Sequence, residues 1–342
     1  MSGVALAAGW AGDLAVGDPR RFHPVAGFGR LALALEGLLH PRERPAPRLP
    51  RARGALFTAL LVGGAAGAAE LAARGAERLA GRRGRALVLA LVTWGALGGR
   101  SLAREGTRIA ELLERGDLAG ARAALPSLAG RDPSQLDASG ISRAVVESLA
   151  ENTADAVVGA LVWGVVAGPG GVAAYRAANT LDAMVGHRSP RYERFGFAAA
   201  KLDDALGWPG ARLGALLTVA LAPAVEGSGK EALRILRRDG AAHPSPNAGR
   251  MEAAFAGALG LTLGGPLRYG ERTEERPRLG DGRAATPADA RRAARLSLVV
   301  GAGAALVCAA ARHAALRALT RQTRNQLVSQ TQGSQTAGEL IA

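Results

Sequence analysis

The stretch that decides the fold is residues 146–175, VESLAENTADAVVGALVWGVVAGPGGVAAY. It places Glu147, Glu151 and Asp155 at positions i, i+4 and i+8, and its last twenty residues carry no charge. Such a run has about the length that a helix needs to cross a bilayer. On a helix the three carboxylates share one face, where each like-charged pair costs ~0.2–0.5 kcal/mol. Because an acidic cluster beside lipid needs compensation, the stretch predicts a membrane helix preceded by a site for something positive. The alternative is a solvated helix face on the membrane surface.

Composition extends this prediction to the whole chain. Hydrophobic residues make up 48% of the 342 positions, yet aromatic residues make up only 4% and glycine occurs 47 times. Small apolar residues suit close-packed membrane helices. Further uncharged runs of 13 to 16 residues occur at 54–69, 86–99, 213–225, 253–267 and 296–311. We therefore expect an all-α, polytopic integral membrane protein with four to six spans and amphipathic cytoplasmic helices and loops.

The charge of +14 fits a membrane location. Arginines cluster in short segments on both sides of residues 54–69, and dense arginine marks the cytoplasmic side of a membrane. Because both flanks are basic, the charge rule does not orient this run. The run is also compatible with a re-entrant or interfacial hairpin. The arginines are not interleaved with aromatic residues, so we expect no nucleic-acid partner. Cys308 is the sole cysteine, which excludes an internal disulfide.

Local signals divide the chain into segments. Residues 1–16 predict a short membrane-associated helix, residues 41–53 a proline-rich linker, and residues 104–131 an amphipathic helix pair. Asp132, Pro133 and Gln135 together predict a helix start. We expect residues 1–320 to form a single membrane-embedded domain. Residues 321–342, rich in Gln, Asn, Ser and Thr, predict a disordered polar tail.

Four further polar clusters stand out from the Ala/Leu background. Residues 17–29, GDPRRFHPVAGFG, carry Asp18 and His23; residues 179–186, NTLDAMVG, carry Asn179 and Asp182 on one helical face. Residues 201–204, KLDD, are followed by Arg212, and residues 243–252, HPSPNAGRME, predict a loop. Each cluster alone is weak evidence of a functional site, because a lone histidine in a loop is usually just solvated.

The order and spacing of these motifs, from about residue 13 to about residue 279, resemble the CobD/CbiB family. This resemblance implies an integral membrane adenosylcobinamide-phosphate (cobinamide) synthase of cobalamin biosynthesis. Such an enzyme joins adenosylcobyric acid to (R)-1-amino-2-propanol, or to its O-2-phosphate, with ATP and Mg²⁺. The resemblance also implies an inner-membrane location, a site facing the cytoplasm, corrinoid and aminopropanol substrates, and other pathway enzymes as partners. Ala160, Ala183 and residues 207–210 depart from the family pattern.

Carried over by motif, the resemblance implies a set of site residues, to which we add Lys201; their division into catalytic, substrate-binding and metal sets is our own inference. The catalytic set is Glu147, Glu151, Asp155, Asp182 and His243. The substrate-binding set is Asp18, His23, Asn152, Asn179, Lys201, Arg212, Ser245 and Asn247. The metal set is Glu147, Glu151, Asp155, Asp203 and Asp204. Arg212 or Lys201 would meet a phosphate, and His23 or His243 would take the proton of the attacking ammonium.

Two other functions stay open. A Mg²⁺-dependent membrane transferase would use intramembrane carboxylates, but Asp203 and Asp204 are followed by Ala205-Leu206-Gly207 rather than by a DDxxD-type pattern. A transporter would place carboxylates along its path and would show an internal repeat, which we do not find. Gly229-Lys230 lacks the other residues of a phosphate-binding loop. The expectation of ATP therefore rests on the resemblance alone.

Overall fold

A computed structural model describes residues 2–18, 23–41, 49–187, 189–269 and 272–339; at 267–269, 272–274 and 319–339 it describes the backbone only. The elements in chain order are α1 (Ser2–Val16), α2 (Pro24–Leu39), α3 (Pro50–Ala96), α4 (Gly99–Glu114), α5 (Leu118–Ala124), a 3₁₀ turn (Leu125–Ser127), α6 (Ala138–Thr153), a π-helical turn (Ala154–Val158), α7 (Gly159–Leu181), a second π-helical turn (Asp182–Gly186), α8 (Phe197–Leu221), a second 3₁₀ turn (Ala222–Val225), α9 (Gly229–Asp239), α10 (Ala248–Leu259), β1 (Leu263–Tyr269), β2 (Arg272–Leu279) and α11 (Pro287–Glu339).

The prediction of a polytopic all-α membrane protein is confirmed. Within the described residues, four helical stretches are long and apolar enough to cross a membrane. They are Pro50–Glu114, Ala138–Gly186, Phe197–Val225 and Pro287–Ala318.

Two of the long helices fold back on themselves. α3 breaks at Gly81 and α7 breaks at Gly168, where φ is +59° and +61°. Glycine adopts this left-handed region without steric cost. A Cβ added to Gly171 would lie 2.4 Å from the carbonyl oxygen of Trp163, although residues eight apart are separated by ~12 Å along a straight helix. Residues 156–175 are therefore a helical hairpin, not one straight span. Residues 54–69 lie in the unbroken first part of α3, and its bend comes only afterwards.

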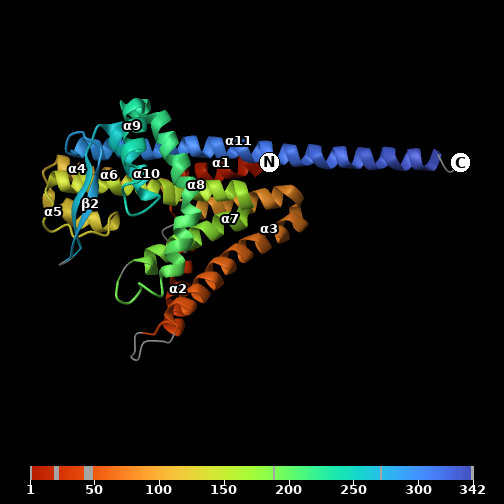
Figure 1. The fold of residues 1–342 in the computed structure, drawn as a ribbon, viewed down its shortest axis with the longest axis horizontal. Coiled ribbons are helices and arrows are strands. Elements are labelled where there is room, and N and C mark those ends of the chain that lie inside the picture. The colour runs from red at the N-terminus through yellow and green to blue at the C-terminus, as the bar shows by residue number, and fades with distance from the viewer. Residues whose placement is uncertain (1, 19–22, 42–48, 188, 270–271, 340–342) are drawn as a thin grey trace.

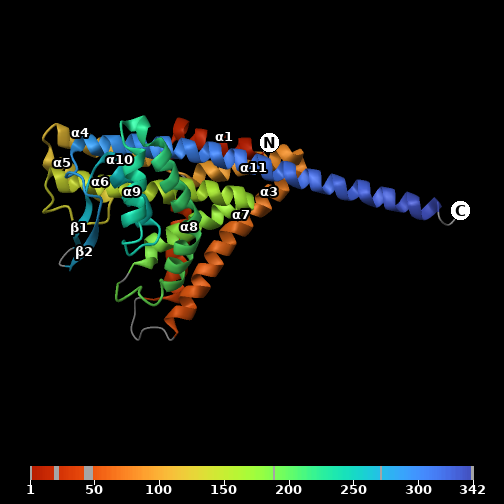
Figure 2. The ribbon, with the colours of Figure 1, turned by 45° about the horizontal axis from the view of Figure 1, so that its top comes forward.

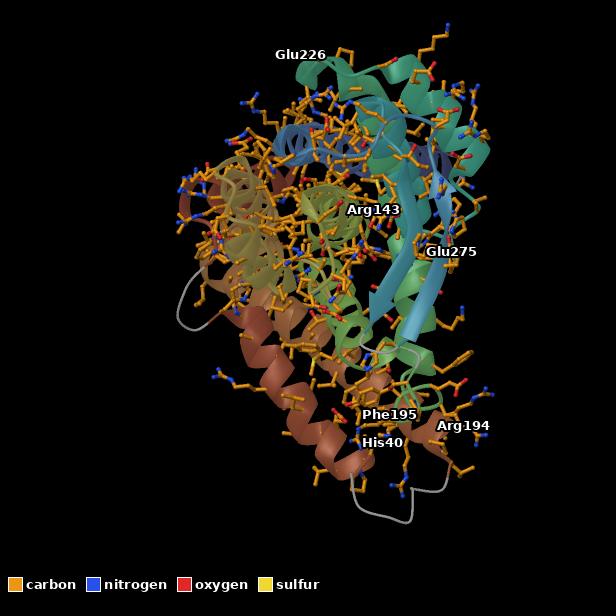
Figure 3. The ribbon with its side chains drawn as sticks, turned by 90° about the vertical axis from the view of Figure 1, so that its left-hand side faces the viewer. His40, Arg143, Arg194, Phe195, Glu226 and Glu275 are labelled. Carbon is orange, nitrogen blue, oxygen red and sulfur yellow. The ribbon has the colours of Figure 1, made fainter. Side chains whose placement is uncertain are left out.

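The helices form two arms that meet at the middle of the molecule (Figure 1). In one arm, α6 and α7 run beside α1 and α11 toward an end that carries α4, α5, α9, α10 and the β1–β2 hairpin. The other arm consists of the first part of α3 together with α2 and α8. α11 continues beyond the bundle in both views (Figure 2). Figure 3 labels His40 and Phe195 at the far end of the second arm. Their rings stack with centroids 4.5 Å apart.

Two local features differ from what the sequence led us to expect. α6 begins at Ala138, because Asp137 accepts the capping hydrogen bond from Gly140 N, whereas Asp132 accepts from Ser134 N in a turn before the helix. The antiparallel β1–β2 hairpin was not predicted. The backbone of α11 runs on to Glu339, through residues 321–339 of the predicted polar tail. The amphipathic pair is confirmed as α4 and α5, and the first helix as α1. Residues 42–48 of the predicted linker lie outside the described residues.

Candidate functional site

Four acidic side chains converge where the two arms meet. We call Glu151, Asp155, Asp182 and Asp203 the carboxylate cluster. Each of them lies close enough to at least one other member to interact with it electrostatically. They come from α6, from both π-helical turns and from α8, so the fold unites three of the motifs seen in the sequence. Single π-helical turns inside helices occur frequently at functional sites.

Hydrogen bonds with basic and amide groups hold one edge of the carboxylate cluster. Asn179 Nδ2 donates to Asp203 Oδ1 at 3.3 Å, and Arg176 Nη1 donates to Asn179 Oδ1 at 3.2 Å. Asp204, next to the cluster, pairs with Lys201 at 3.1 Å. Asn152 turns toward its own helix instead, where its Nδ2 donates to the Ser148 carbonyl at 2.9 Å.

A second polar group joins α8 to the loop before α10. Arg212 Nη1 donates to Asn247 Oδ1 at 2.9 Å, and Asn247 Nδ2 donates to the Asp204 carbonyl at 2.8 Å. Gly207 makes room for this amide, because a Cβ there would lie 2.7 Å from Asn247 Nδ2. Ser245 Oγ accepts from Asn247 N at 3.3 Å and so shapes the start of α10. The predicted Arg212, Ser245 and Asn247 are thus brought beside the acidic residues of α8.

His243 lies in a buried polar group with Glu252 and Arg276. Its Nε2 is 3.0 Å from Arg276 Nη1 and 3.9 Å from Glu252 Oε1. His243 Nδ1 accepts from Ser245 N at 3.0 Å, and a guanidinium only donates, so both ring nitrogens face hydrogen-bond donors. Burial, followed by repulsion from Glu147 and Glu151, raises the pKa of Glu252 well above its usual value.

Glu147 is separated from the carboxylate cluster by its own partners. Its Oε2 lies 2.6 Å from Arg131 Nη2, and its Oε1 accepts from Gly264 N at 2.7 Å. Only 4% of the residue is exposed. Both carboxylate oxygens of Glu147 therefore tie α6 to the loop before it and to β1.

The first motif lies at the opposite edge of the site. His23 caps α2, accepting from Val25 N at Nδ1, and its Nε2 is 3.7 Å from Asp18 Oδ1. Asp18 also interacts electrostatically with Arg176. Asp18 and His23 therefore approach the site from the α1–α2 side. Arg20 and Arg21, which lie between them in the sequence, are outside the described residues.

The donor chemistry of the carboxylate cluster fits Mg²⁺. Among the described residues, no three His, Cys, Asp or Glu side chains form a metal-binding group by themselves. Mg²⁺ commonly takes one or two carboxylates and completes its shell with water and substrate phosphates. Asp155 and Asp203 interact with each other and come from different helices, so they could supply two such ligands together.

Sequence reasoning missed four residues of this region: Arg131, Arg176, Glu252 and Arg276. Glu252 and Arg176 did lie within or beside the quoted motifs, and Arg176 directly follows the longest uncharged run. That position was the available signal, but an arginine at the end of an apolar run is usually interpreted as a membrane-surface anchor. Arg276 reaches the site through the β hairpin, which was itself unpredicted.

Comparison with known proteins gives a consistent result. The family model described as CobD/Cbib protein matches residues 6–297. Cobalamin biosynthesis protein CobD of Mycobacterium tuberculosis (strain ATCC 25618 / H37Rv) is 53% identical over 295 residues, which cover 86% of this chain and 91% of that protein. Proteins of the same name from Pelobacter propionicus (43% over 270 residues; 79% and 82% covered) and Rhodobacter capsulatus (42% over 306 residues; 89% and 93% covered) are also similar. No solved structure matches the chain. The motif resemblance is confirmed, and the chain belongs to the CobD/Cbib family.

Proposed function

We propose that this membrane protein is an ATP-dependent amide ligase of cobalamin biosynthesis, joining (R)-1-amino-2-propanol O-2-phosphate to the corrin f-side-chain carboxylate of adenosylcobyric acid. The role in cobalamin biosynthesis follows from membership of the family. The observation that carries the reaction is the carboxylate cluster, with Arg176, Lys201 and Arg212 around it. Acidic groups suit a metal ion and an ammonium, and basic groups suit phosphates.

The chemistry requires activation, because a carboxylate is a poor electrophile. When bound, ATP and Mg²⁺ would supply that activation by phosphoryl transfer to the corrin carboxylate. Overall, one amide bond forms, one ATP becomes ADP, one carboxylate oxygen leaves with the phosphate, and the ammonium nitrogen loses two protons, the first of which must leave before it attacks. We assign Asp155 and Asp203 to the metal, and Lys201 and Arg212 to phosphate oxygens. His243 receives, at Nε2, the first proton that the ammonium loses, after Arg276 moves away from that nitrogen.

We also propose that the site opens to the cytoplasm at the inner membrane. A corrin ring is wider than a single helix, so it must approach from water rather than from between packed spans. The end of the molecule that carries α4, α5, α9 and the β hairpin is built from short or amphipathic elements (Figure 1). These elements would cover the corrinoid while the carboxylate cluster holds the amine.

Complementation tests this function. A cobinamide-synthase deletion strain supplied with adenosylcobyric acid should regain growth in the absence of added cobalamin when it expresses the wild-type chain. Expression of Glu151→Gln at the same membrane level should not restore growth. Failure of the wild-type chain, present in the membrane at a normal level, would exclude the proposed reaction. Growth with Glu151→Gln equal to that with wild type would remove the carboxylate cluster from it.

A further inference from the structure

A basic groove lies where α4 meets α1 and α11, and none of its lining residues belongs to the carboxylate cluster. Its volume is about 690 Å³, within the ~300–1,000 Å³ typical of ligand sites. Arg100, Arg104 and Arg108 of α4 line it, together with Leu14 of α1 and Leu298 of α11. The groove therefore combines a cationic side with an apolar side.

The three arginines share one face of α4, because they lie at positions i, i+4 and i+8. Arg108 pairs with Glu105 at 3.0 Å, and Arg100 Nη1 donates to the Ala15 carbonyl. Arg104 is exposed and makes no hydrogen bond or ion pair with any residue that the structure describes. Like charges at this spacing destabilise a helix, so an anion in the basic groove would stabilise α4.

The acidic residue in the wall of the basic groove is neutralised by its own partners. Glu111 Oε2 lies 3.7 Å from Arg115 Nη2, and Glu111 Oε1 lies 3.6 Å from Arg291 Nη1. The charge that remains in the groove is therefore positive, and it fits an anion.

The basic groove lies where three helices change from apolar to charged residues. The uncharged run 86–99 ends at Arg100, the run 296–311 begins after Arg295, and the first charged residue of α1 is Asp13. Charged side chains rarely lie within the hydrocarbon of a bilayer. This level therefore marks the edge of the membrane core.

The apolar side of the basic groove continues a surface that faces lipid. Leu306 of α11 is 70% exposed, and it lies on the same helical face as Leu298, eight residues earlier. Val4 of α1 is also 70% exposed. Exposed apolar surface of this kind marks contact with a membrane, so acyl chains can extend from this surface into the groove.

The arginines of α4 rise from the edge of the membrane core through the headgroup region. α4 packs along the start of α11, and Arg291 pairs with Glu114 at the end of α4, so the two helices run antiparallel. Along α4, Arg104 lies ~6 Å and Arg108 ~12 Å beyond Arg100. The headgroup region is ~5–8 Å thick on each side of the hydrocarbon core. Arg104 therefore lies at the depth of lipid phosphates.

We propose that the basic groove binds an anionic phospholipid. The lipid phosphate lies against the Arg104 guanidinium, with Arg100 and Arg108 on either side, and the acyl chains pack on Leu14 and Leu298. Arginine binds phosphate oxygens through paired N–H donors, and basic pockets between membrane helices bind lipid headgroups. The bound lipid fixes how deeply the start of α4 sits in the membrane. This site is independent of the proposed amide ligation.

Binding to the purified full-length protein in detergent tests the proposal. Native mass spectrometry at increasing lipid concentration should show at least tenfold tighter binding of dioleoylphosphatidylglycerol than of dioleoylphosphatidylcholine, which has the same acyl chains and a zwitterionic headgroup. Arg104→Gln should lower affinity for the anionic lipid about fivefold, since one arginine near a membrane surface contributes ~1 kcal/mol. It should leave affinity for the zwitterionic lipid within about twofold. Equal affinities of the wild-type chain for the two lipids would overturn the proposal.

Arg115→Gln is the matched control. Arg115 is also exposed, but it lies ~22 Å beyond Arg100 along the helix and so outside the headgroup region. The variant removes the same charge and should leave affinity for phosphatidylglycerol within about twofold of wild type. Arg104→Lys, which keeps the charge, should lose less affinity than Arg104→Gln. Equal losses in Arg104→Gln and Arg115→Gln would show that net charge rather than the groove attracts the lipid, and would contradict the proposal.

A soluble phosphate ester could present the same charge as the lipid. sn-Glycerol 3-phosphate at millimolar concentration should not displace phosphatidylglycerol, because it has no acyl chains to pack on Leu14 and Leu298. Displacement would assign the basic groove to a soluble phosphate and overturn the proposal. Lipid binding that depends on Arg104, in a chain that forms no amide, would refute the proposed reaction and keep this site.

Discussion

Arg131 Nη2 lies 2.6 Å from Glu147 Oε2, and the two side chains are only 8% and 5% exposed. Glu147 therefore stabilises the fold, although it belongs to the same sequence stripe as Glu151. Removing one partner of a buried ion pair leaves an uncompensated charge and typically costs ~3–5 kcal/mol. We expect Glu147→Ala to lower the free energy of unfolding in detergent by about that amount. Unchanged stability together with lost activity would instead place Glu147 in the chemistry.

Glu151→Gln should have the opposite effect, with turnover lost and stability retained. Gln keeps the size of the side chain and removes one of the mutually repelling charges of the carboxylate cluster. We expect stability to be unchanged or increased, and turnover to fall at least ~10²-fold, as is usual when a catalytic or metal-positioning group is lost. Steady-state kinetics and a melting curve on the same preparation provide the check. Activity within about threefold of wild type would exclude Glu151 from the mechanism.

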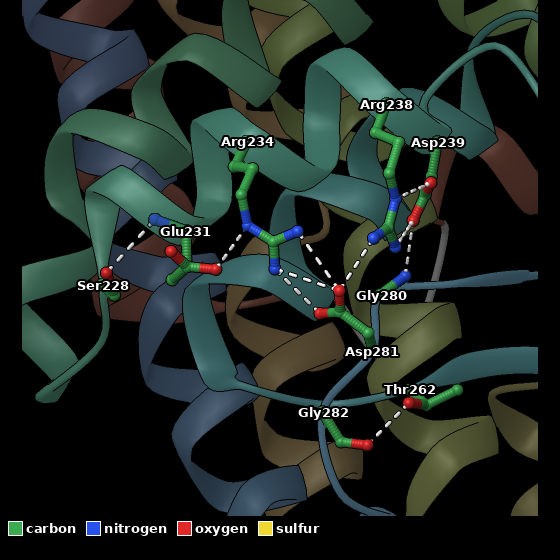
Figure 4. Close-up of polar contacts among 9 residues, drawn as sticks. All are labelled: Ser228, Glu231, Arg234, Arg238, Asp239, Thr262, Gly280, Asp281 and Gly282. Atoms are coloured by element: carbon green, nitrogen blue, oxygen red, sulfur yellow. Dashed lines mark hydrogen bonds and ion pairs between the residues drawn. The ribbon is translucent and has the colours of Figure 1, made fainter.

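The α9 network predicts a dependence of stability on pH. Arg234 and Arg238 both bind Asp281, Arg238 also binds Asp239, and Asp239 accepts from Gly280 N (Figure 4). Hydrogen bonds from Arg234 and then Arg238 lower the pKa of Asp281 to about 2, from 3.8. The hydrogen bond from Arg238 also lowers the pKa of Asp239.

Because these pKa values are lower in the folded state, the network contributes its full stability above about pH 4 and loses it as the pH falls toward 2. Asp281→Asn should therefore show a shallower loss of stability than wild type across this window. Unfolding curves at pH values from 2 to 5 measure it, and Lys230→Gln, at an exposed position of α9, is the control. Identical slopes for Asp281→Asn and wild type would show that the network does not contribute.

His243 and His23 should differ in their pH–rate profiles. If His243 accepts the ammonium proton, His243→Ala should lose most turnover at low pH and recover partly at high pH, where the free amine becomes abundant. His23 caps α2 and lies near Asp18, so His23→Ala should show a loss without such recovery. Recovery in His23→Ala instead of His243→Ala would reverse the two roles.

The sequence predicted the class of fold and most of the site because both depend on local patterns. Long uncharged runs predict membrane helices wherever they lie, and Asp155, Asp182 and Asp203 stand out as charges in apolar surroundings. The convergence of these three side chains in space was harder to predict from the sequence. It depends on the two π-helical turns and on the bend at Gly168, where one residue changes the direction of a helix.

Glu147 shows where periodicity alone is insufficient. Its spacing from Glu151 is that of a shared helical face, but Arg131 approaches it from the loop before α6 and Gly264 approaches it from β1. Arg176 shows the converse. Nothing in its local sequence separates a membrane-surface anchor from a buried guanidinium, because burial depends on how α2 and α3 pack against α7.

Reconstitution with purified components tests the central claim most directly. The full-length protein in detergent, supplied with adenosylcobyric acid, 1-aminopropan-2-yl phosphate, ATP and Mg²⁺, should form the corrinoid amide with one ADP released per amide bond. Chromatography coupled to mass spectrometry follows the amide, and a coupled assay follows ADP. Omitting ATP, or using Glu151→Gln, should abolish both products. Amide formation without ATP, or ATP hydrolysis that is independent of the amine and the corrinoid, would contradict the account.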